Sequence, residues 1–232
     1  MTLLSSLNAE GIVSSSQVVE CTGLPGSGKT YFCAALSEGF RTLGRQAQAN
    51  SLQLGGVSRM KRTNWKIWLC VQALMHWPKA TVTLTHWIWR QDLPRARRLV
   101  LSINAISVLP FYRKTARVIL LDQGLVQIAW AVLYHLIRRD KELVDGTRFR
   151  HLLEQIYGDR RIQLVEVHAQ KGWHAAKLAA RENWTEAQET QWYISLTSQQ
   201  NAQHALWTLL DPILEPKGSV RVTRLENRRD AG

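Results

Sequence analysis

The sequence predicts an α/β protein with a five-stranded parallel β-sheet, and three observations lead to that fold class. A short β-rich segment, residues 17–22, runs into a glycine-rich loop and then into a helical segment, residues 31–43. An apolar segment, residues 117–122, ends in a carboxylate and is typical of a strand buried on both faces. Strand-like and helix-like segments then alternate toward the end of the chain, which is the pattern of βαβ units.

Each element is predicted from its apolar period and its boundary residues. We expect strands at residues 17–22, 46–52, 117–122, 161–167 and 219–225. We expect helices at residues 31–43, 125–139, 149–157 and 186–210, and three more within residues 57–117, of which the second spans 82–93 and the third 94–109. Proline lacks the N–H that continues a helix, so Pro78, Pro110 and Pro212 are each expected to end one.

The loop between the first strand and the first helix, Gly23 to Thr30, fits the pattern G-x-x-x-x-G-K-[ST] at every required position. Glycines let successive backbone N–H groups converge on an anion, and the helix that follows adds its positive end. A plain glycine turn is the alternative, but such a turn has no need of Lys-Thr directly after the last glycine. The residues expected to bind the phosphates of ATP are Gly23, Pro25, Gly26, Ser27, Gly28, Lys29 and Thr30.

Asp122 is the acid expected to accompany this loop, because it ends a buried strand in the middle of the chain. Lys29 should reach the β- and γ-phosphates, and the Thr30 hydroxyl should ligand Mg²⁺ together with Asp122. An aspartate at a strand end can also be a helix or turn cap. The phosphate loop favours the metal-binding role, and Asp122 could instead accept the proton of an acceptor hydroxyl.

A lid-like segment is expected at residues 168–185, just after the fourth strand. Lys177 and Arg181 are four residues apart, so on a helix they share a face. Two such cations could close over the transferred phosphate and act as catalytic groups. The alternative is an ordinary solvated helix face.

The length of the chain indicates how many domains to expect, and its cysteines indicate the compartment. A chain of 232 residues can form one large α/β domain, and we expect residues 1–232 to do so. Its three cysteines are odd in number and their spacing fits neither a disulfide framework nor a zinc site, which favours a reducing compartment. The first sixteen residues do not read as a signal peptide, so we expect a cytoplasmic protein.

The net charge of +12 is concentrated in one block, residues 57–117, which we interpret as a helical insert. This block holds twelve Lys and Arg residues and a single acid, Asp92, whereas the segments before and after it are nearly neutral. It also holds five of the ten tryptophans. Such helices can lie on an anionic membrane surface, so we expect peripheral binding at the inner face of the membrane. Alternatively the block forms an acceptor pocket, or packs its tryptophans into the core and leaves its cations solvated.

The phosphate loop and the strand that ends in Asp122 resemble the P-loop kinases of the thymidylate and nucleoside monophosphate kinase type, and the segment with Lys177 and Arg181 follows in the family's order. Among these the chain looks most like divergent members found with bacterial surface-polysaccharide genes. The resemblance implies a three-layer P-loop sandwich with the phosphate-loop strand central, an acceptor-binding insert and a lid. The chain departs from the family at Gln123, where thymidylate kinases have arginine, and at Lys177, where arginine is usual.

These observations predict an ATP- and Mg²⁺-dependent phosphotransferase acting on a small molecule: a nucleoside or nucleotide, a sugar, or a lipid-linked acceptor. Many small-molecule kinases carry an acidic base at the end of the second strand, where this chain has Gln46, Gln48 and Asn50. The alternative is a regulatory ATPase or switch whose basic block docks on a membrane or nucleic acid. We do not expect plain nucleic-acid binding, because no recognition motif is present.

Overall fold

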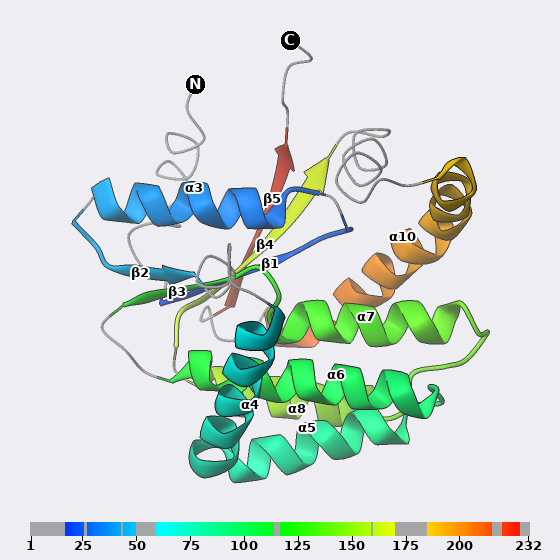
Figure 1. The fold of residues 1–232 in the computed structure, drawn as a ribbon, viewed down its shortest axis with the longest axis horizontal. Helices are drawn as coiled ribbons and strands as arrows, with labels where there is room; N and C mark the ends of the chain where they lie inside the picture. Colours follow the sequence, from blue (N-terminus) through cyan, green and yellow to red (C-terminus); the bar gives the residue numbers. More distant parts are fainter. Residues whose placement is uncertain are drawn as a thin grey trace.

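Five parallel strands form one sheet in the computed structural model of the chain, and helices cover both of its faces (Figure 1). The structure describes residues 17–25, 27–42, 44–49, 59–113, 117–158, 160–169, 185–214 and 220–227. The strands are β1 Val18–Thr22, β2 Ala47–Ala49, β3 Val118–Leu121, β4 Ile162–Ala169 and β5 Val220–Asn227. They lie in the order β2-β3-β1-β4-β5, and every neighbouring pair is parallel. The predicted five-stranded parallel sheet is confirmed, with the strand before the glycine loop at its centre.

The two strands beyond β1 are longer than predicted. β4 and β5 pair over eight residues, from Ile162 opposite Val220 to Ala169 opposite Asn227, so each runs two residues past its expected end. At the other edge, β2 is a three-residue strand whose predicted continuation at residues 50–52 lies outside the described residues.

Seven α-helices lie within the described residues. They are α3 Lys29–Thr42, α4 Arg59–His76, α5 Pro78–Arg90, α6 Arg95–Val108, α7 Leu125–Ile137, α8 Gly146–Tyr157 and α10 Glu186–Leu214. A 3-10 turn, η2 Leu109–Tyr112, follows α6 directly. Figure 1 shows α3 on one face of the sheet and the other helices on the opposite face.

Successive side chains of β1 point to opposite faces of the sheet and belong to two separate buried clusters. Val19 and Cys21 pack with Phe32, Leu36 and Phe40 of α3 on one face. Val18 belongs to the larger cluster on the other face, which is built from α7, α8, α10 and the inner sides of α4 to α6. The result is a three-layer α/β arrangement with helices on both sides of a parallel sheet.

One predicted proline stop is wrong, and one helix begins at a proline earlier than predicted. Pro212 does not end the last long helix, because α10 continues through it to Leu214. Proline removes one backbone donor, but Ile213 and Leu214 pack against the core cluster and hold the final turn. Pro78 follows the end of α4 as expected, and it also begins α5 four residues earlier than predicted, since proline suits the first turn of a helix.

Other helix boundaries differ by smaller amounts. α8 begins at Gly146, three residues before its predicted start, because the Asp145 side chain accepts a hydrogen bond from the Arg148 N–H and caps the helix. Pro110 lies inside the turn η2, which continues the path of α6 for one more turn.

The helices of residues 57–117 contribute their inner sides to the large cluster. Trp87 is fully buried and stacks on Phe149 of α8 with ring centroids 4.4 Å apart. The helical period places Trp65 and Trp68 on one face with Leu69. The two tryptophans stack on each other with ring centroids 4.8 Å apart. That face is divided, because Leu69 is buried whereas Trp68 is 49% exposed.

Candidate active site

The sequence-predicted loop and Asp122 lie at the carboxyl edge of the sheet, where the neighbouring strands β1 and β3 end. The two strands are parallel, with Glu20 opposite Leu121. The chain therefore leaves β1 into the glycine loop beside the point where it leaves β3 into Asp122. In open parallel sheets, ligands bind beyond the carboxyl ends of the strands.

Glycine is required where the loop leaves β1. Gly23 has φ +138°, and a Cβ atom there would overlap the carbonyl oxygen of Val167 on β4. The loop then closes on itself, since the Ser27 N–H donates to the Leu24 carbonyl at 3.1 Å. Gly28 has φ +93°, and its carbonyl accepts from the Phe32 N–H at 2.9 Å as α3 begins. Strand, tight loop and helix thus follow in the order that phosphate binding requires.

Lys29 turns its ammonium group back into the loop. Its Nζ donates to the carbonyl oxygens of Gly23 at 2.8 Å and Leu24 at 2.9 Å. Burial of this group lowers the pKa of Lys29 to about 8, although the negative charge of Asp122 acts in the opposite direction. The ammonium group lies at the end of the lysine side chain. The side chain can therefore turn from these two carbonyl oxygens to other oxygen atoms while the loop backbone stays as it is.

Thr30 and Asp122 contact each other directly. The Thr30 hydroxyl donates to Asp122 Oδ2 at 3.0 Å, although the two residues are 92 positions apart in the chain. Asp122 is buried, whereas Thr30 is exposed at the first turn of α3. A hydroxyl and a carboxylate are the oxygen ligands that Mg²⁺ accepts, with the remaining positions filled by phosphate oxygens and water. The pair therefore fits the metal that the sequence predicts.

No richer metal centre competes with this pair in the described part of the chain. Among those residues, no group of three or more His, Cys, Asp or Glu side chains could hold an ion. A magnesium site that borrows most of its ligands from a nucleotide would have only one or two protein ligands.

The sequence reasoning missed a second polar cluster, centred on Glu20 of β1. This carboxylate is fully buried and accepts hydrogen bonds from Tyr112 Oη at 2.7 Å, from Tyr157 Oη at 3.1 Å and from the Val126 N–H. Tyr112 Oη also accepts from the Leu125 N–H at 3.1 Å. Burial raises the pKa of Glu20 above its ordinary value, despite the donors around it.

The Glu20 cluster fixes the start of α7, three residues after Asp122. The carboxylate occupies the N-terminal end of this helix, where a negative charge satisfies otherwise unpaired N–H groups. A Cβ atom at Gly124 would overlap the Glu20 carboxyl group, so only glycine fits there. Glu20 is thus a positioning residue rather than a group open to a ligand. The one signal for it in the sequence is a lone acid inside an apolar strand.

Cys21 and Cys33 are also close to the loop but belong to the core. Both are fully buried, and their Sγ atoms are 3.4 Å apart. The hydrogen bond with Cys33 and, to a smaller extent, burial raise the pKa of the Cys21 thiol well above its ordinary value. Cys21 therefore does not form a reactive thiolate. All three cysteines are free thiols.

Three predicted site residues lie outside the described residues: Gly26 of the loop, and Lys177 and Arg181 of the lid-like segment. Pro25 and Ser27 lie in the loop, half-buried and buried respectively. Gln46, which directly precedes β2 at the amino edge of the sheet, accepts a hydrogen bond from Arg117 Nε at 2.9 Å. The structure therefore brings together the loop, Lys29, Thr30 and Asp122, and does not bear on the lid.

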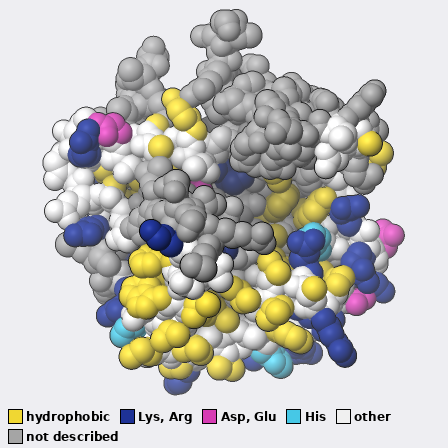
Figure 2. All heavy atoms as spheres, viewed as in Figure 1, with side chains coloured by type: hydrophobic (Ala, Val, Ile, Leu, Met, Phe, Trp, Pro, Cys, Tyr) yellow, Lys and Arg dark blue, Asp and Glu magenta, His cyan; other side chains and the backbone are white. Residues whose placement is uncertain are grey.

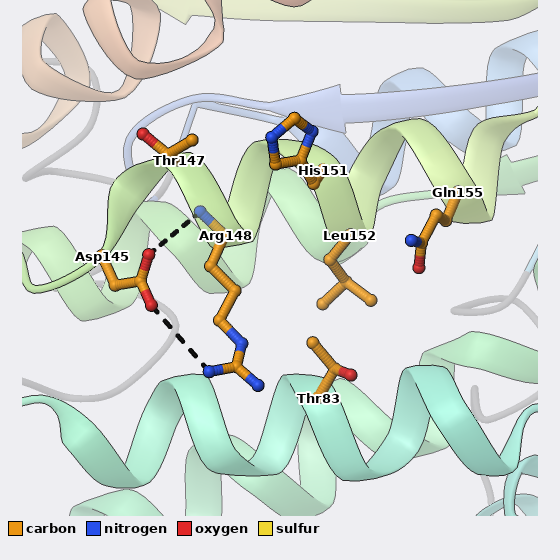
Figure 3. A pocket seen from close by; sticks show the side chains of 7 residues that line it. All are labelled: Thr83, Asp145, Thr147, Arg148, His151, Leu152 and Gln155. Carbon is orange, nitrogen blue, oxygen red and sulfur yellow. Dashed lines mark hydrogen bonds and ion pairs between the residues drawn. The ribbon is translucent and has the colours of Figure 1, made fainter.

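Two surface hollows lie elsewhere. One, of about 420 Å³, lies between α5 and α8, and Figure 3 shows Arg148 reaching across it from α8 toward α5. Asp145 and Arg148 pair across this hollow, with Arg148 Nη1 4.0 Å from Asp145 Oδ2. Asp145 also lies 3.6 Å from Arg90, which is outside the hollow. The other, of about 720 Å³, lies between α10 and β5 and includes Trp207 and Arg224. Neither is lined by a residue of the phosphate loop.

No protein-family model matches the chain, and no curated protein matches it. None of the helices in the described ranges has the combination of length and apolarity that crossing a bilayer takes.

Proposed function

We propose that this protein is a magnesium- and ATP-dependent phosphotransferase with the three-layer sandwich of the P-loop kinases. The hydrogen bond between Thr30 and Asp122 carries the proposal. It joins the hydroxyl of the glycine loop to the carboxylate of the neighbouring strand, and both are the residue types that hold Mg²⁺ beside a nucleotide in such folds. The central position of β1 and the all-parallel sheet also support this assignment.

The residues of the loop would bind the donor by position and charge. Lys29 would exchange the carbonyl oxygens of Gly23 and Leu24 for the β- and γ-phosphate oxygens, while the N–H groups of the loop and the start of α3 receive the rest of the phosphate chain. Bound Mg²⁺ would neutralise charge that develops on the phosphates during transfer. Thr30 and Asp122 would hold it.

The acceptor is a small molecule with a hydroxyl or phosphate group: a nucleoside or nucleotide, a sugar, or a lipid-linked sugar. Asp122 either binds the metal or takes the acceptor's proton, and Lys177 and Arg181 would contact the transferred phosphate from the lid. The free thiols favour a reducing compartment, and we place the protein in the cytoplasm.

The test is a product analysis. Purified protein is incubated with ATP, Mg²⁺ and a panel of nucleosides, nucleotides, sugars and lipid-linked sugars, and the products are identified by mass. We expect one acceptor class to gain one phosphoryl group for each ADP formed. Hydrolysis of ATP without a phosphorylated product, stimulated only by lipid or nucleic acid, would instead identify a regulatory ATPase.

A further inference from the structure

An unusual concentration of apolar side chains lies on the outer surface of α4 and α6. Thirteen large apolar side chains are exposed in the described part of the chain, and eight of them lie on these two helices. Each of the eight is at least 40% exposed. We name this set the α4–α6 apolar face, and its members are Ile67, Trp68, Val71, Leu74, Met75, Leu99, Val100 and Ile103.

The helical period places these residues opposite the core. On α4, residues 67, 71, 74 and 75 lie on one side, and the buried Leu69 and Ala73 lie on the other. α4 is therefore apolar on both sides, although its outer side meets no other part of the described chain that would bury it. On α6, Leu99 and Ile103 are likewise exposed while Leu101 and Ala105 are buried. Apolar surface on both sides of a helix normally means that both sides are covered.

The outer sides of the two helices adjoin. Cys70 Sγ of α4 lies 3.7 Å from the carbonyl oxygen of Ile103, and Lys66 Nζ donates to Asn104 at 2.8 Å. Figure 2 shows yellow side chains gathered over the lower part of the molecule, where Figure 1 places α4 and α6. The exposed side chains thus form one patch rather than isolated surface residues, and patches of this kind mark interaction sites.

Cations flank this patch, and acids are almost absent from its part of the chain. Arg95 and Arg97 are exposed on the first turn of α6, and Lys61 is exposed near the start of α4. In Figure 2, blue side chains border the yellow area, and magenta ones are few. The one acid of residues 57–117, Asp92, lies 3.3 Å from Lys141. The partner of this face must therefore be both apolar and anionic.

We propose that the α4–α6 apolar face docks on an anionic lipid bilayer, with Trp68 and the aliphatic side chains in the headgroup region and the flanking cations at lipid phosphates. Tryptophan and a basic rim are typical of surfaces that lie in this region. A second copy of the chain would bring two strongly cationic blocks together. Nucleic acid would pair with the cations but leave aliphatic side chains such as Leu74 and Val100 without apolar contact. Binding through this face does not require that the phosphate loop act as a kinase.

The test is sedimentation of the full chain with vesicles of phosphatidylcholine mixed with phosphatidylglycerol, and with vesicles of phosphatidylcholine alone. Wild type should sediment with the mixed vesicles at low salt and not with the neutral ones. The triple variant Ile67→Gln, Val71→Gln, Met75→Gln should bind the mixed vesicles at least tenfold more weakly. Glutamine keeps the helix, because it is a good helix former.

Two further variants test the contribution of the cations to vesicle binding and the specificity for the α4–α6 apolar face. Arg95→Glu with Arg97→Glu should also weaken binding at least tenfold, since each cation near an anionic surface contributes about fivefold and each reversal removes one cation and adds an acid. Val144→Gln with Ile194→Gln changes two exposed apolar residues outside the face and should bind as wild type does. Thermal melting of every variant, together with ATP binding, checks that the fold is retained.

Three results would overturn the proposal. Wild type could remain in the supernatant with both kinds of vesicle. The triple glutamine variant could bind as tightly as wild type, which would assign binding to charge alone. A dimer in sedimentation equilibrium, abolished by the same variant while vesicles bind none of the proteins, would show that the face meets a second copy.

Discussion

The carboxyl edge of the sheet and the helices α4 to α6 use charge in opposite ways. At the edge, charges are few and each is held at a defined contact: Lys29 at two loop carbonyls, Asp122 at Thr30 and Glu20 at two tyrosines. Over residues 57–117, twelve cations accompany one acid, and eight large apolar side chains of α4 and α6 are exposed among them.

This difference indicates two different kinds of partner. A small, highly charged ligand needs polar groups that converge on one point and are already oriented, as those at the carboxyl edge are. An extended partner needs area, and the α4–α6 apolar face offers area without a converging set of polar groups. Matched substitutions in the two regions test whether they serve different partners.

The largest effect should be the difference in stability loss between a tryptophan on the buried side of these helices and one on their exposed side. Trp87 is fully buried against Phe149, so Trp87→Ala should lower the free energy of unfolding by about 3–5 kcal/mol. Trp68 is half exposed, and Trp68→Ala should cost about 1 kcal/mol or less. Urea denaturation measures both. Equal losses would mean that the outer side of α4 is buried in the folded protein.

A cation at the edge should matter far more than one on the helices. Lys29→Ala removes the charge aimed at the β- and γ-phosphates and should reduce phosphate transfer by about 10²-fold or more. Lys79→Ala removes an exposed lysine from α5 and should leave transfer unchanged. Steady-state kinetics gives both values. Nucleotide binding that survives Lys29→Ala unaltered would show that the loop does not serve a nucleotide.

An acid at the edge should likewise differ from the acid of the helices. Asp122→Asn should lower transfer by about 10²-fold and raise the Mg²⁺ concentration needed for half-maximal activity, because it weakens a metal ligand. Asp92→Asn loses only an exposed ion pair with Lys141 and should change neither quantity. A Mg²⁺ titration of both variants at saturating ATP is the measurement. An unchanged Mg²⁺ requirement in Asp122→Asn would favour the role of proton acceptor.

The sequence predicted the parts of this molecule that local patterns determine. The loop around Lys29 follows from eight consecutive residues, and the strand and helix beside it follow from their apolar patterns. The apolar run before Asp122 predicts a strand whose end meets that loop. The hydrogen bond between Thr30 and Asp122 shows that the loop and the strand end do meet. The roles of the two residues remain proposals. Helix existence was also predictable, whereas the path of α10 through Pro212 depended on packing of Ile213 and Leu214.

What the sequence did not predict depends on contacts between distant segments. Glu20 finds its partners at Tyr112, Val126 and Tyr157, which are between 92 and 137 positions away. The outer side of α4 was missed for a related reason. Periodicity shows that Trp65, Trp68 and Leu69 can share a face, but only the fold decides that Leu69 is buried and Trp68 is not.

A smaller effect should appear in the pH dependence of ATP use. With the pKa of Lys29 at about 8 in the free protein, the ammonium loses its proton as pH rises through 8, and kcat/KM for ATP should fall about tenfold by pH 9. Bound phosphates favour the charged form, so kcat at saturating ATP should not bend in this range. Lys29→Ala should remove the bend that the wild type shows.

The same pKa shift acts on stability with the opposite sign. The unfolded chain keeps the ordinary lysine value of 10.5, so between pH 8 and 10.5 the unfolded state binds more protons than the folded state. The contribution of Lys29 to the free energy of unfolding should therefore rise with pH in this window while ATP binding falls. Denaturation of wild type and Lys29→Ala across the window separates this contribution from those of other groups, and parallel curves would show that Lys29 titrates normally.

The smallest effect should come from the cluster that connects the two regions. Tyr157 Oη donates to Glu20 at 3.1 Å in a fully buried setting, so Tyr157→Phe should cost about 1–2 kcal/mol of stability. Tyr134 is half-buried, and its hydroxyl lies 3.4 Å from an exposed Arg138 nitrogen, so Tyr134→Phe should cost less than about 0.5 kcal/mol. Because Glu20 positions the start of α7 beside Asp122, Tyr157→Phe should also raise the Mg²⁺ requirement slightly, whereas Tyr134→Phe should not. Urea denaturation and Mg²⁺ titration test both parts, and a stability loss in Tyr157→Phe without any change in Mg²⁺ requirement would confine the Glu20 cluster to folding.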